Sequence, residues 1–96
     1  MPAEAVDREQ VQVVFREWCR SRCSVYATVF DNNGMQTCAG QVASVDDEAA
    51  VIADALVELR VPYASAGDSA VACLDERMKS VTLTWRDGTS AFIVTR

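Results

Sequence analysis

The residues of this chain that could carry out chemistry are few, and histidine is not among them. General acid–base catalysis would have to use carboxylates, Lys79, tyrosine or cysteine. The one dense group of acids is Asp46, Asp47 and Glu48, but consecutive side chains diverge in both helices and strands. A solvated corner or the first turn of a helix explains them. The chain has no glycine-rich phosphate loop and no nucleophile elbow, so we predict a protein that is not an enzyme and has no catalytic residue.

The four cysteines could in principle bind a metal or form disulfides. Cys19, Cys23, Cys38 and Cys73 contain no C-x-x-C pair, whereas four-thiolate zinc sites usually have two close pairs. Cys19 and Cys23 are four residues apart across the end of a predicted helix, which is poor spacing for a disulfide. We therefore predict small core residues in a reducing compartment, and neither metal nor cofactor.

Three residues are candidates for binding a ligand. Arg60 and Tyr63 could stack on and pair with a base or another flat ligand, and Asp46 could line a pocket. Each residue also has a structural explanation, since Tyr63 suits a core or interface and Asp46 suits a turn. Arg60, Tyr63 and Asp46 are the predicted binding residues.

Composition and charge limit the classes of partner. The 96 residues are half hydrophobic and 24% charged, which indicates one globular domain spanning residues 1–96. The net charge of −5 argues against general affinity for nucleic acid, because that affinity depends on Lys and Arg neutralising phosphates. No apolar run reaches the roughly 20 residues of a membrane helix, and the first residues do not resemble a secretory signal. We expect a cytoplasmic protein without membrane contact.

Three parts of the chain show clear secondary-structure patterns. Residues 6–20 are predicted to form a helix, because Asp7 and Gln10 have capping-box spacing before an apolar stripe. Residues 24–30 and 35–45 alternate around an Asn-Gly turn, as two strands do, and we expect the first strand to be covered on both faces. Gly40 is a plausible bend or bulge in the second strand. A terminal hairpin is predicted around Asp87-Gly88.

The segment 46–60 has two interpretations. As a helix it would be capped by Ser44 or Asp46 and would have an apolar stripe, and its alanines and leucines favour this. As two strands it would reverse direction at Asp54, and the alternation from Val57 onward favours that. Neither pattern decides between them.

Short motifs in residues 24–65 resemble the Sm-like family of small barrels, which includes the bacterial RNA chaperone Hfq. The motifs are the strand 25–30, the Asn33-Gly34 turn, the run Gly40-Gln41-Val42 and the corner Val45-Asp46. The resemblance implies a mainly β protein with an amino-terminal helix at 6–20. Its core, residues 24–65, would be a bent, SH3-like or Sm-like barrel, and residues 66–96 would be an extension with a terminal hairpin.

The resemblance also implies a function, with specific departures. The lysine and histidine that hold uridine-rich RNA in the family's central pore are replaced here by Pro62 and Tyr63, and an expected aromatic residue is Glu48. We therefore expect a non-enzymatic binding module that forms a homo-oligomer, either a ring or a dimer. RNA and a protein partner are both candidate ligands.

The alternative is a profilin-like, roadblock-type α/β domain that acts as a regulatory or structural scaffold. In that fold residues 46–60 would be a second helix lying across a sheet. The order helix, two strands, helix, three strands would fit the chain, although no specific motif supports it.

Overall fold

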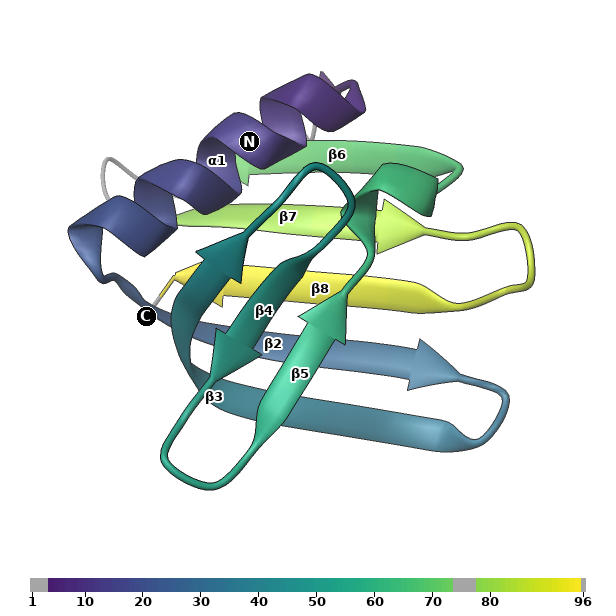
Figure 1. Cartoon of the computed structure of the whole chain (residues 1–96). Coiled ribbons are helices and arrows are strands. Elements are labelled where there is room, and N and C mark those ends of the chain that lie inside the picture. Colours follow the sequence, from purple (N-terminus) through teal and green to yellow (C-terminus); the bar gives the residue numbers. More distant parts are fainter. Residues whose placement is uncertain (1–3, 74–77, 96) are drawn as a thin grey trace.

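A computed structural model describes residues 4–73 and 78–95, and it is mainly β (Figure 1). One helix accompanies eight strands that form a single antiparallel sheet in the order β1-β6-β7-β8-β2-β3-β4-β5. The elements are β1 (Glu4–Ala5), α1 (Arg8–Ser21), β2 (Ser24–Asp31), β3 (Gly34–Val45), β4 (Ala50–Ala53), β5 (Glu58–Val61), a 3₁₀ turn (Tyr63–Ser65), β6 (Asp68–Cys73), β7 (Lys79–Thr84) and β8 (Ser90–Thr95).

The helix α1 begins with the predicted capping box. The Asp7 carboxylate accepts a hydrogen bond from the backbone N–H of Gln10 at 2.9 Å, and the Gln10 side chain accepts one from the Asp7 N–H at 3.1 Å. Along one side of the helix Val11, Phe15 and Trp18 are buried. This apolar stripe holds α1 against the inner face of the sheet, which confirms the helix predicted at 6–20.

The long strand β3 folds the sheet back over itself. A Cβ atom on Gly40 would lie 2.2 Å from the carbonyl oxygen of Ala53, so only glycine allows the two backbones to approach this closely. A register shift between Val42 and Ser44 adds a bulge. Beyond the bend, β3, β4 and β5 cross in front of β2 and β8 (Figure 1). The core lies between this layer, α1 and the inner face of the sheet.

The segment 46–60 adopts the two-strand interpretation. Asp54 accepts hydrogen bonds from the backbone N–H groups of Leu56 and Val57, at 2.7 and 2.8 Å, and so closes the turn between β4 and β5. β4 is paired with β3 on one side and β5 on the other. Pairing on both sides overrides the helix propensity of the alanines and leucines. The second helix of the roadblock-type alternative is therefore wrong.

The sheet is open, and this differs from the predicted bent, SH3-like or Sm-like barrel. β1 and β5 stand at its two ends in the described part of the chain. Residues 66–96, predicted as an extension, contribute β6, β7 and β8, and β8 lies between β7 and β2. The local motifs could not reveal this pairing, because β8 and β2 are far apart in sequence.

Candidate binding surfaces

The predicted binding residues Asp46 and Tyr63 meet in a structural corner. The Tyr63 hydroxyl donates to the carbonyl oxygen of Asp46 and accepts a hydrogen bond from the Gln12 side chain at 2.9 Å. Tyr63 is only 1% exposed, and its ring lies 5.7 Å from that of Phe15. This burial agrees with the core explanation of Tyr63. The tyrosine joins the β3–β4 corner to α1 and the core.

The carboxylate of Asp46 is occupied by its own turn. It accepts hydrogen bonds from the backbone N–H groups of Glu48 and Ala49, at 2.8 and 2.7 Å. Both bonds lower the pKa of Asp46, the one from Ala49 more than the one from Glu48, and so they favour the charged carboxylate. Its geometry is that of a turn-forming aspartate.

Arg60 is exposed and separate from the buried ring of Tyr63. Its guanidinium lies 3.9 Å from the Glu48 carboxylate, and both side chains are largely exposed. An exposed pair of this kind contributes little to stability. Arg60 can therefore exchange this partner for another at small cost.

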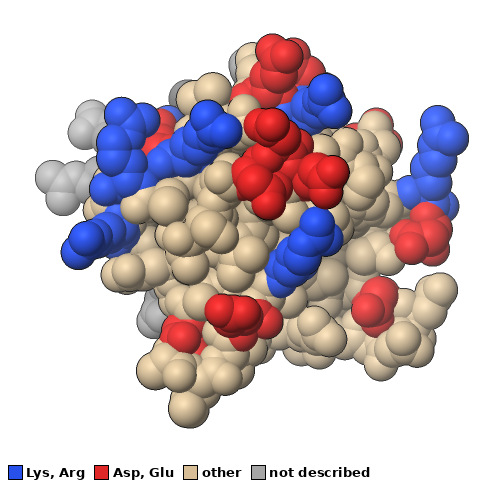
Figure 2. All heavy atoms as spheres, in the orientation of Figure 1, with Lys and Arg blue, Asp and Glu red and all other residues tan. Residues whose placement is uncertain are grey.

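A hollow of about 380 Å³ lies between the start of α1 and the β3–β4 corner, and it is polar. It is lined by Arg8, Glu9, Gln12, Asp47, Glu48 and Tyr63. Figure 2 shows the acidic group of this corner beside the basic side chains of the helix. Within the described residues no buried side-chain polar atom lacks a partner, so nothing in the hollow points to a particular ligand.

The cysteines are placed as core and half-buried residues. Cys38 is buried, and burial together with the charge of Asp54 raises the pKa of its thiol. Cys19 and Cys23 are half-buried against the core, and the side chain of Cys73 lies outside the described set. Over residues 4–73 and 78–95 no group of His, Cys, Asp and Glu is arranged to hold a metal ion. In the same part of the chain no helix has the length and apolarity that crossing a membrane requires.

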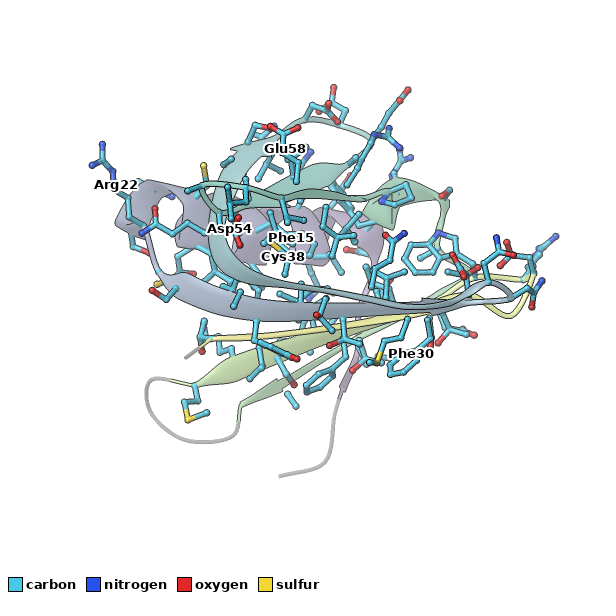
Figure 3. All side chains as sticks on the ribbon, turned by 90° about the horizontal axis from the view of Figure 1, so that it is seen from below. Phe15, Arg22, Phe30, Cys38, Asp54 and Glu58 are labelled. Carbon is cyan, nitrogen blue, oxygen red and sulfur yellow. The ribbon has the colours of Figure 1, made fainter. Side chains whose placement is uncertain are left out.

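One face of the sheet is covered by no described element, and we call it the uncovered face. Phe30 points away from the side on which Phe15 and Cys38 lie (Figure 3). The strand pairings place further aromatic and small side chains on the same face as Phe30. The face comprises Ala70, Ala72, Ser80, Thr82, Thr84, Ser90, Phe92, Val94, Ser24, Tyr26, Thr28, Phe30, Met35, Thr37, Ala39 and Gln41.

The uncovered face has no charged side chain among the residues that define it, and it mixes aromatic and aliphatic side chains with serine, threonine and glutamine. Tyr26, Phe30 and Phe92 are 41%, 47% and 40% exposed, and Met35 is more exposed still. None of the side chains that define the face is ionisable near neutral pH; Asp68, at the start of β6, marks its border. Exposed large hydrophobic side chains gathered on one face of a sheet are typical of interaction sites.

The sequence did not single out this surface. Alternation identified the strand 24–30 and separated its two sides, but the strand was expected to be covered on both faces, which is wrong for the described structure. The available signal was the second side of this strand, where Tyr26, Thr28 and Phe30 follow one another. Whether another layer covers them depends on the tertiary arrangement alone.

Comparisons with known proteins show the fold. No family model and no curated protein matches the chain. A solved structure that does match is the crystal structure of apo-PhuS, a heme-binding protein from Pseudomonas aeruginosa, with a TM-score of 0.68 and 16% identity. The match covers 97% of this chain and 29% of PhuS, so the chain spans less than a third of that protein. The similarity and the open sheet overturn the Sm-like assignment, and with it the pore that the assignment implied.

Proposed function

We propose that the chain is a non-enzymatic protein-binding module that pairs with a second copy of itself through the uncovered face. The observation that carries the proposal is a face with exposed aromatic side chains and no charged side chain among its described residues, in a chain whose net charge is −5. Two copies could bring these faces together without like-charge repulsion at the contact. Large aromatic side chains are the residues that most often supply binding energy in such contacts.

The size of the face suits a dimer at the lower end of the stable range. Five strands spaced about 4.8 Å apart, each contributing about six residues of 3.3 Å, span roughly 480 Å². Two copies would bury about 1,000 Å² of flat area, and corrugated side chains increase the true value. Specific interfaces begin at about 1,200 Å² in total. The face is therefore large enough for a dimer that forms reversibly.

Symmetry further favours a second copy as the occupant. In a two-fold dimer the same patch meets itself, so each residue needs a partner that tolerates its own kind. Thr28 and Phe92 are directly paired near the middle of the face, and two copies would place aromatic rings against small threonine side chains. The acids of the β3–β4 corner belong to the layer of β3, β4 and β5, which crosses the inner face of the sheet (Figure 1), away from this contact.

Haem is the ligand named for PhuS, but the residues of this chain give it no specific support. Histidine is absent, so an iron ligand would have to be cysteine, methionine or tyrosine. Titration with haemin followed by absorbance tests this directly. A tight, one-to-one shift of the Soret band would favour haem binding over the proposal.

The dimer is tested by light scattering coupled to size exclusion over a range of concentrations. We expect the mass to rise toward twice 10.5 kDa, and Phe92→Asp to give a single chain because it buries a charge at the contact. Val13→Asp is the matched control, since Val13 is 62% exposed on the solvent side of α1, and it should dimerise normally. A wild-type chain that stays single at millimolar concentration, or a Phe92→Asp variant that still dimerises, would overturn the proposal.

A further inference from the structure

The strand β5 is an open edge of the sheet. At the other end of the sheet the two-residue strand β1 is paired with β6, whereas no described strand lies beyond β5. The bond from the Asp54 N–H to the Val57 carbonyl, at 3.0 Å, sets the alternation of the β4–β5 ladder. By that alternation Leu59 and Val61 bond toward β4, and the N–H and C=O groups of Glu58 and Arg60 point away from it.

A hollow lies directly beside this edge. Arg60 and Pro62 line it from the β5 side, and Val29 and Trp85 line it from the far ends of β2 and β7, with a volume of about 270 Å³. The Trp85 indole N–H donates to the Ser65 hydroxyl at 3.0 Å, which holds the ring in place. Since pockets for whole small molecules usually begin near 300 Å³, the hollow suits one apolar side chain.

We propose that β5 binds an extended segment of a partner protein as an added antiparallel strand, with one apolar side chain of that segment seated in the hollow beside Trp85. Strand addition uses main-chain hydrogen bonds for affinity and pockets for alternate side chains for specificity. Both parts are present here, because the outward groups of Glu58 and Arg60 offer the bonds and the hollow offers the pocket. This site belongs to the layer opposite the uncovered face and does not depend on dimerisation.

The charges on β5 specify the sequence that would fit. Glu58 and Arg60 are exposed on the same side of the strand and two residues apart. An antiparallel segment would therefore carry an acidic residue opposite Arg60 and a basic residue opposite Glu58. Arg60 and Pro62 line the hollow and are two residues apart on one side of the chain, so the apolar residue that enters it would lie opposite Pro62, two positions before the acid. The expected segment thus carries an apolar residue, an acid and a base at alternate positions, in that order.

The test uses a phage-displayed library of short random peptides, selected on the full chain. Arg60→Pro removes an outward N–H but no bond of the β4 ladder, and Arg60→Ala, the matched control, removes only the guanidinium. We expect enriched peptides to show the alternating pattern. By fluorescence anisotropy they should bind Arg60→Ala about two- to fivefold more weakly, as loss of an exposed ion pair predicts. Binding to Arg60→Pro should fall at least about tenfold.

Two further measurements keep the test independent of the fold of Arg60→Pro. A selected peptide that is N-methylated at the residue opposite Arg60 should lose binding to the unmodified chain. Binding should also slow amide hydrogen exchange at Glu58 and Arg60, and Phe92→Asp should bind the peptide normally. The proposal is overturned if no peptide is enriched, if N-methylation has no effect, or if exchange slows elsewhere instead.

Discussion

The two faces of the sheet differ in what lies against them. On the inner face Val25, Ala27 and Ile93 are fully buried beneath α1 and the layer of β3, β4 and β5. On the uncovered face Tyr26 and Phe92, in the same two strands, keep about two fifths of their surface exposed. Both faces belong to the same hydrogen-bonded strands, so the difference comes from the layer that covers only one of them. The covered face stabilises the monomer, and the uncovered face is the one that we propose for association.

The largest loss of stability should come from removing a side chain of α1 that covers the inner face of the sheet. Phe15→Ala removes a fully buried ring that contacts Trp18 and Tyr63, and truncations of this kind cost about 3–5 kcal/mol. Urea denaturation followed by circular dichroism measures the change. A loss below about 1 kcal/mol would show that α1 contributes little to covering the sheet.

The corner that attaches the covering layer to α1 should have a smaller effect. Tyr63→Phe removes the hydroxyl that donates to the Asp46 carbonyl and accepts from Gln12. Leaving part-buried partners unsatisfied costs about 1–2 kcal/mol. The same denaturation experiment measures this, and Tyr26→Phe on the uncovered face is the control that should change little. Equal losses for the two variants would contradict the contrast between the faces.

Acid should lower the stability of the protein by weakening three turns, which join β3 to β4, β4 to β5, and β7 to β8. Backbone N–H groups lower the pKa of Asp46, Asp54 and Asp87. The folded state thus prefers their charged forms, and unfolded aspartate titrates near about pH 4. The stabilisation is present above that pH and is lost as pH falls through the lower folded-state pKa values.

Urea midpoints measured from pH 6 down to pH 2 check this expectation. The midpoint should fall with pH, and Asp54→Asn should flatten the profile because amide oxygen still accepts hydrogen bonds without titrating. Thr82→Ser on the uncovered face should leave the profile unchanged. An identical profile for Asp54→Asn would remove Asp54 from the explanation.

The smallest change in stability is expected for a substitution on the uncovered face, measured in the single chain. Phe92→Thr replaces a half-exposed ring with another residue that suits strands. At concentrations where light scattering shows single chains, stability should change by no more than about 0.5 kcal/mol. The same substitution should weaken the dimer. A large loss in the single chain would mean that this face also supports the monomer.

Much of the local structure was predictable, because it depends on neighbours in sequence. The capping box at Asp7 and Gln10 and the terminal hairpin around Asp87-Gly88 formed as predicted, whereas the turn at Asp54 was one of two open interpretations. Of the predicted binding residues, Asp46 and Tyr63 proved to hold a corner, and Arg60 stands at an open edge. The edge and its hollow could not be predicted, since Trp85 and Arg60 are brought together only by the folded layers.

By itself the sequence determined where the helix begins, which residues alternate in strands, and where the Asn33-Gly34 and Asp87-Gly88 turns reverse the chain. These features follow from hydrogen bonds and side-chain periods within a few residues. Only the tertiary structure decided that β8 pairs with β2, that the sheet stays open, and that the face bearing Tyr26 and Phe92 has no described cover. Pairing between distant strands depends on which surfaces pack best in the whole chain, and alternation is the same whichever neighbour a strand acquires.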